Sequence, residues 1–286
     1  KKLKGPILGT VEQVDLYKNG RLQLAFATPN KLYVIDRNGK DVDQFPLNFK
    51  DTITQPLAVF DYDKQRNYRF LITQNENLLM YDSKGKSVKG FIYKPNKQIS
   101  SQPKHFRVRG KDFIVFSAGN QLKLLNRRGA IRVKVKENID FSGEDIYFYK
   151  SLFTTTSTKG DLIQVNTKGA VSRQSLGLES KHNITCSSKT LVTRSANKLT
   201  IKSNTIDLDF GSYSAPILFY LRDKIYISIT DLQAQKIWMF DSQAKPFASI
   251  PVFGSSAIDL ANIDSDTALE FVTKSDSNSL ILYQLY

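Results

Sequence analysis

The chain has 286 residues and a formal net charge of +14, with 41% hydrophobic and 11% aromatic residues, which is a globular composition with a β bias. The single cysteine, Cys186, excludes an intramolecular disulfide and a zinc site built from several thiolates. No stretch approaches the roughly 18 consecutive apolar residues of a membrane-spanning helix.

Along the chain, one pattern recurs: a polar residue, four or five alternating apolar residues, then Asp or Asn and a turn. The Asp or Asn side chain can bond to the backbone two residues on, and a following Gly supplies a positive φ, so each copy predicts a β-hairpin. The copies, in order, are residues 31–39, 77–85, 121–129, 161–169, 198–203, 236–244 and 279–284.

The mean spacing of these seven copies is about 41 residues, close to the period of about 40 to 45 residues of a four-stranded propeller blade. No segment shows a sustained apolar period of about 3.6 residues, so helices are not expected. The sequence therefore predicts an all-β fold, a seven-bladed β-propeller in one domain. The predicted blades are residues 11–50, 55–95, 101–137, 140–178, 180–210, 213–252 and 256–286.

Each period has room for four strands. In the second copy we expect them at 56–61, 68–73, 77–81 and 87–93, and in the sixth copy at 215–220, 224–229, 236–240 and 246–250. The last copy stops after its third strand. Because residues 2–8 resemble the outer strand 87–93, we expect this N-terminal strand to close the last blade beside residues 279–285.

The unit from Leu32 to Lys40 is similar to repeats of quinoprotein-like propellers, including the outer-membrane-assembly lipoprotein propeller. The segment from Ile258 to Glu270 resembles integrin-type FG-GAP repeats. The chain as a whole resembles the C-terminal propeller of bacterial cell-envelope proteins and lipoproteins, and it begins without Met, so we expect it to be part of a larger protein. The resemblance implies a periplasmic or cell-envelope location; the alternative is the cytoplasm.

The FG-GAP resemblance also implies a calcium site in the last blade, because such loops place oxygen ligands at positions 1, 3, 5 and 9. Those positions hold Asn262, Asp264, Asp266 and Glu270. Two features depart from the pattern: the first ligand is Asn rather than Asp, and no Gly relaxes the turn. The alternative interpretation is a hydrogen-bonded turn between two strands. No other cofactor is expected.

The positive charge is concentrated in residues 101–136, which hold ten Lys or Arg residues and one acid, Asp112. Such a surface could bind an acidic protein, an anionic membrane or phosphates. The alternation of charged with apolar residues also fits a solvated blade whose edge lysines prevent strand pairing. The candidate partner-binding residues are Arg107, Arg109, Arg127, Arg128, Arg132 and Lys134.

Signals for an enzyme are weak. The two histidines, His105 and His182, fall in no metal-binding or triad motif, and the single Trp238 cannot form the tryptophan-rich floor that a quinone cofactor needs. The leading hypothesis is therefore a non-catalytic protein-interaction scaffold, with a protein partner in a membrane-associated complex. One rival is a propeller enzyme acting on glycans through Asp61, Asp63 and Asp264. The other rival is a protein that binds an anionic ligand through residues 101–136. This ligand would be a lipid headgroup or, less favoured, a nucleic acid.

Overall fold

The computed structural model describes residues 1–264, 266–276 and 278–285. In these residues the chain forms 26 β-strands, arranged in seven antiparallel sheets whose strands follow chain order, and no helix. Nothing in the described chain could therefore cross a membrane as a helix. The all-β prediction is confirmed, and the number of sheets equals the number of predicted blades.

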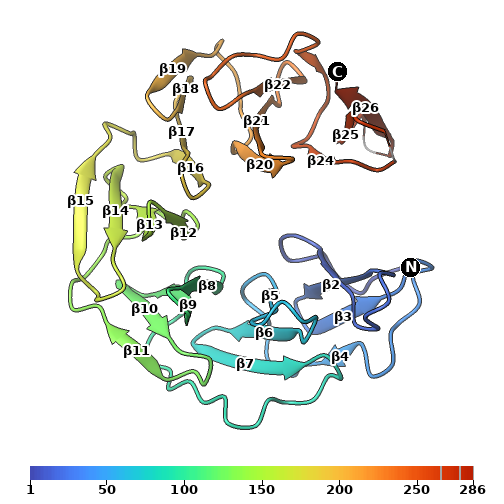
Figure 1. Ribbon diagram of the computed structural model, residues 1–286, viewed down its shortest axis with the longest axis vertical. Helices are drawn as coiled ribbons and strands as arrows, with labels where there is room; N and C mark the ends of the chain where they lie inside the picture. The colour runs from blue at the N-terminus through green and yellow to red at the C-terminus, as the bar shows by residue number, and fades with distance from the viewer. Residues whose placement is uncertain (265, 277, 286) are drawn as a thin grey trace. The chain divides into compact units, whose positions relative to one another are not determined.

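The first compact unit comprises residues 1–146 and 166–171 and contains three sheets in chain order (Figure 1). The first sheet consists of β1 (Glu12–Val14), β2 (Gln23–Thr28), β3 (Lys31–Ile35) and β4 (Leu47–Asn48). The second consists of β5 (Ala58–Phe60), β6 (Arg69–Gln74) and β7 (Asn77–Asp82). The third consists of β8 (Lys104–Val108), β9 (Lys111–Ala118), β10 (Gln121–Leu125) and β11 (Ile131–Lys134).

The second compact unit comprises residues 147–165 and 172–286. Its first sheet is β12 (Tyr147–Tyr149), β13 (Leu152–Thr156), β14 (Asp161–Val165) and β15 (Val171–Ser175). Next come β16 (His182–Cys186), β17 (Leu191–Ser195), β18 (Lys198–Ile201) and β19 (Asn204–Asp207). The sixth sheet is β20 (Ile217–Leu221), β21 (Lys224–Asp231), β22 (Lys236–Phe240) and β23 (Val252–Phe253). The last is β24 (Asp259–Ala261), β25 (Leu269–Lys274) and β26 (Leu280–Leu285).

The repeated Asp or Asn closes the same turn wherever it occurs after the third strand of a sheet. In the first sheet, Oδ1 of Asp36 accepts hydrogen bonds from the backbone N–H of Asn38 at 2.8 Å and of Lys40 at 2.9 Å. Gly39 takes the left-handed conformation there, with φ of +74°. The same pair of side-chain bonds recurs at Asp82, Asn126, Asn166 and Asp241.

Neighbouring sheets within each unit pack face to face through apolar side chains. In the first unit, Phe70 from β6 packs among residues of the first sheet, and Phe116 from β9 packs among residues of the second sheet. In the second unit, Ile227 of β21 packs with β17 and β18, and Phe271 of β25 packs with β22. Alternating apolar residues in the sequence predict strands with one apolar face. The sheets stack on one another through these faces.

Three predicted outer strands differ from the structure. Residues 87–93 contribute one isolated bridge, Tyr81 to Ser87, and the described second sheet has three strands. In the sixth sheet the outer strand lies at β23 rather than at 246–250. Residues 2–8 form no strand, and the backbone N–H of Leu8 donates to Ala27 of β2 instead. The described last sheet also has three strands. The closing of the last blade by the N-terminal segment stays a prediction.

Candidate functional site

A buried carboxylate organises the basic third sheet. Asp112 lies near the start of β9, and its side chain is only 8% exposed. Its Oδ2 accepts a hydrogen bond from Arg127 Nε at 2.6 Å, and its Oδ1 lies 2.8 Å from His105 Nε2 and 3.3 Å from Arg107 Nη1. Burial opposes ionisation of Asp112, but the bonds from His105 and Arg127 outweigh it and hold the pKa below its usual value.

The same network reaches the second sheet. Arg127 Nη2 lies 2.8 Å from Asp63 Oδ1, and its guanidinium lies 4.6 Å from the centroid of the Tyr62 ring. Tyr62 in turn packs edge-on against His105, with ring centroids 4.8 Å apart. The bond from Arg127 lowers the pKa of Asp63, and burial raises that of Tyr62. Arg127 is therefore a structural residue that joins two sheets.

The six candidate partner-binding residues accordingly fall into two groups. Arg107 and Arg127 pair with Asp112, and Arg132 Nε donates to the Asp112 carbonyl oxygen at 2.7 Å. The others are exposed: Arg109, Arg128 and Lys134. The sequence showed the charged segment as composition. It carried no signal for the contacts of Arg127 with Tyr62 and Asp63, which lie more than 40 residues away along the chain.

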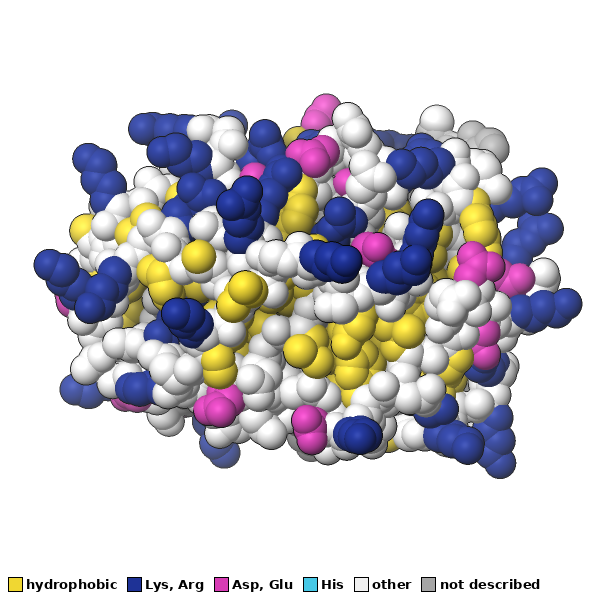
Figure 2. Space-filling view, turned by 90° about the horizontal axis from the view of Figure 1, so that it is seen from below, with side chains coloured by type: hydrophobic (Ala, Val, Ile, Leu, Met, Phe, Trp, Pro, Cys, Tyr) yellow, Lys and Arg dark blue, Asp and Glu magenta, His cyan; other side chains and the backbone are white. Residues whose placement is uncertain are grey.

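Two exposed isoleucines accompany the free cations. Ile92 is 66% exposed and Ile131 is 53% exposed. The backbone N–H of Ile92 donates to the carbonyl of Arg128 at 2.8 Å, which brings both isoleucines to the β10–β11 turn. Figure 2 views the side of the first unit where β4, β7 and β11 lie, and there hydrophobic side chains form a strip among many Lys and Arg side chains.

The predicted calcium residues come together at the turn between β24 and β25. One carboxylate oxygen from each of Asp264, Asp266 and Glu270 lies within 4.8 Å of the others. Glu270 is 5% exposed; its Oε2 accepts the Ile263 N–H at 2.9 Å, while its Oε1 is buried without a hydrogen-bond partner. The Asn262 side-chain amide instead donates to the carbonyls of Asp266 and Ala268.

These contacts fit both interpretations of the turn. The carboxylates of Asp264 and Asp266 cap backbone N–H groups within it, as a metal-free turn would require. The unpartnered Glu270 oxygen is what a cation would satisfy, since calcium prefers several oxygen ligands at about 2.4 Å. The donor set is therefore chemically suited to calcium.

The carboxylates proposed for a glycan-cleaving enzyme have other roles. Asp61 accepts hydrogen bonds from the backbone N–H groups of Gln65 and Arg66, at 3.2 and 2.8 Å, and so closes the β5–β6 turn. Asp63 is paired with Arg127.

His182 is a buried residue. Its two ring nitrogens lie 2.7 Å from the Glu179 carbonyl oxygen and 2.8 Å from Thr156 Oγ1.

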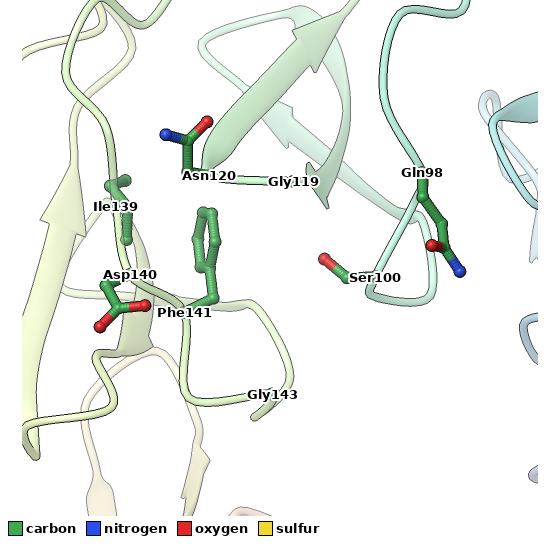
Figure 3. Close-up of a pocket in the computed structure, with 8 residues that line it drawn as sticks. All are labelled: Gln98, Ser100, Gly119, Asn120, Ile139, Asp140, Phe141 and Gly143. Carbon is green, nitrogen blue, oxygen red and sulfur yellow. The ribbon is translucent and has the colours of Figure 1, made fainter.

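A pocket of about 340 Å³ lies in the first unit beside the β9–β10 hairpin (Figure 3). The ring of Phe141 stands next to Gly119 and Asn120, and the carboxylate of Asp140 points away from Ser100. Asp140 is the one titratable side chain among the lining residues. A general acid and a general base need two such groups, so this lining does not make an acid–base site.

No family model matches the chain, and no curated protein matches its sequence. Solved structures do match: BBS1N in complex with ARL6DN has a TM-score of 0.69 at 15% identity, covering 99% of this chain and 93% of that one. The fold is a seven-bladed β-propeller. BamB from Moraxella catarrhalis gives a TM-score of 0.62 at 14% identity, with 99% and 86% of the two chains covered.

The propeller is also similar to an enzyme. Virginiamycin B lyase from Staphylococcus aureus has a TM-score of 0.59 at 13% identity, covering 97% of this chain and 99% of that one. The match to BamB confirms, for the fold, the expected resemblance to the outer-membrane-assembly propeller. Because enzymes and non-enzymes share this fold, function has to be argued from the residues of this propeller.

Proposed function

We propose that this propeller is a non-catalytic scaffold that binds an acidic protein partner through the surface formed by Ile92, Arg128, Ile131 and Lys134, here called the β11 surface. The observation that carries the proposal is the pair of exposed isoleucines beside exposed cations at the β10–β11 turn. Arg107 and Arg127 form ion pairs with Asp112. Arg128 and Lys134, the cations of the β11 surface, do not contact this carboxylate.

The composition of the β11 surface suits a protein partner. Protein interfaces commonly combine an apolar centre that becomes fully buried with a polar rim that stays wet. Cations in the rim steer an acidic partner and raise the rate of association. A nucleic acid ligand would need the cations without the isoleucines, so the two exposed apolar side chains favour protein over nucleic acid.

The structural neighbours are consistent with this proposal, since BBS1N was solved as a complex with the protein ARL6DN. The resemblance to envelope propellers supports a periplasmic or cell-envelope location and a membrane-associated complex.

Charge reversal in the β11 surface tests the proposal. We expect R128E/K134E to lose the partner that the wild-type chain captures from native cells, because two attractive contacts become repulsive. The matched control is K40E/K50E, which makes the same charge change at two exposed lysines of the first sheet. Equal capture by both double variants would contradict the proposal. A mobility-shift titration with single-stranded DNA tests the nucleic-acid alternative, which predicts a steep loss of binding with salt.

Calcium binding is a second candidate function, favoured by the buried and unpartnered Oε1 of Glu270. Asp264 and Asp266 would supply the other carboxylates, and the bound ion would tie the β24–β25 turn to β25. Calorimetry with calcium chloride should show one site in the wild-type chain and none in E270Q. The control D276N changes a carboxylate that caps Asn278 and Ser279 elsewhere in the last sheet, and it should bind as the wild type does. Absence of calcium-dependent heat in the wild type would leave the turn as a purely hydrogen-bonded one.

A further inference from the structure

A basic pocket of about 340 Å³ lies in the first unit, between the β8–β9 hairpin, β11 and the turn at residues 166–171. Four of its lining side chains are cationic: Arg109, Lys111, Arg132 and Lys168. Its lining contains no acid. The pocket thus gathers positive charge from three separate segments of the chain.

The charges in this pocket have no acidic partner in the part of the chain that the structure describes. None of the four cations forms an ion pair with any residue in the described ranges 1–264, 266–276 and 278–285, whereas the nearby Arg107 and Arg127 are paired with Asp112. The neighbouring turns add no negative charge, because they hold Asn126 and Asn166 where other sheets have Asp. Like charges that converge without a counter-ion repel one another, so a bound anion would stabilise the pocket.

One of the four cations is held in place before any ligand arrives. Arg132 Nε donates to the carbonyl oxygen of Asp112 at 2.7 Å, and the guanidinium lies 5.3 Å from the centroid of the Phe113 ring. The Nε bond does not use the two terminal nitrogens, which are the pair that binds oxyanions in a fork. Because the side chain is already ordered, less conformational entropy is lost on binding.

The remaining lining indicates what the anion carries. Phe113 and Val133 give the pocket an apolar wall, and Thr167 offers a hydroxyl group. Four cations favour a group with close to two negative charges over a single carboxylate, and a phosphate monoester carries about −1.5 to −2 at neutral pH. We propose that this pocket binds a small phosphate monoester, with the phosphate among Arg109, Lys111, Arg132 and Lys168 and the organic part against Phe113.

Calorimetry with phenyl phosphate on the full chain tests this assignment. We expect saturable binding that weakens about tenfold in K111A and about tenfold in K168A, since each variant removes one charged donor. The control K89A removes an exposed lysine elsewhere in the same unit and should bind as the wild type does. Circular dichroism of each variant checks that the fold is retained. Benzoate, which has the same ring and one negative charge, should bind at least about tenfold more weakly than phenyl phosphate.

Three results would overturn the assignment: no saturation by about 10 mM phenyl phosphate, equal affinities for benzoate and phenyl phosphate, or unchanged affinity in both lysine variants. Vesicles of phosphatidic acid in phosphatidylcholine separate a lipid source from a soluble one. Binding to these vesicles without binding to phenyl phosphate would also overturn it. The variant I92A/I131A removes the apolar part of the β11 surface and changes no charge, so it should keep its affinity for phenyl phosphate. The pocket and the β11 surface can therefore fail independently.

Discussion

Replacing Asp112 by Asn removes the negative charge around which His105, Arg107 and Arg127 gather. Arg107 is 48% exposed, so its ion pair contributes little. The bonds from His105 and Arg127 end on a side chain that is 8% exposed, and each is worth about 1.5 kcal/mol. We therefore expect D112N to lower the free energy of unfolding by about 3 kcal/mol, the low end for breaking a buried pair.

The loss can be measured as a shift in melting temperature. For 286 residues unfolding together, the entropy of unfolding is about 0.6 kcal/mol/K, so Tm should fall by about 5 °C. Circular dichroism reports on all the sheets, while fluorescence reports on Trp238, which lies in the second unit. The control D43N makes the same substitution at an exposed position. A shift of D112N no larger than that of D43N would refute the reasoning.

Three further predictions concern single buried or strained positions. Burial lowers the pKa of His105 below 6.5 despite the carboxylate beside it, so the unfolded chain takes up the proton first. The contribution of His105 to the free energy of unfolding is therefore fully present above about pH 6.5 and is lost as the pH falls. We expect H105Q to flatten the dependence of Tm on pH in that range. An unchanged slope would contradict this. Gly160 has φ of +79°, and an added Cβ would lie 2.2 Å from the Leu178 carbonyl oxygen. G160A should destabilise by about 2 kcal/mol or more, and clearly more than G177A, where φ is +65° and no atom lies within 4 Å; equal losses would rule out the contact as the cause. Lys123 is 7% exposed, and burial lowers its pKa. We therefore expect K123M to raise the free energy of unfolding at pH 7 by about 1 kcal/mol. A lower Tm for K123M would contradict this, because it would show that hydrogen bonds to the ammonium outweigh the cost of its burial.

The repeating hairpins could be predicted from the sequence because their cause is local. Each Asp or Asn bonds to backbone N–H groups within four residues, and the same spacing returns in five of the sheets. The outer strands were harder to predict from the sequence. Their apolar residues are typical of a strand, but each segment also contains a glycine whose φ is positive. Gly90 has φ of +84° inside the expected strand 87–93, and Gly5 has φ of +129° inside the expected strand 2–8. Both interrupt an extended backbone.

The candidate sites follow the same division. The acidic turn around Asp264 and Asp266 is local, and the structure brings its carboxylates together with Glu270 as the spacing implies. The basic segment was visible as composition, but neither the second partner of Arg127 nor the full lining of the basic pocket lies within one repeat. Arg127 meets Asp63 across 64 residues, and Lys168 comes to the basic pocket from a different sheet. No periodicity within one repeat could show those pairings.

The turn after each third strand has a consequence for how the surface of this protein can be altered. Its two hydrogen bonds end on a single Oδ1, an atom that Asp and Asn both possess, and the distances at Asp36 and Asn126 agree within about 0.3 Å. Exchanging one residue for the other therefore moves the isoelectric point and retains both hydrogen bonds of the turn. The surface can thus gain or lose one negative charge at each of these five positions with the same backbone geometry.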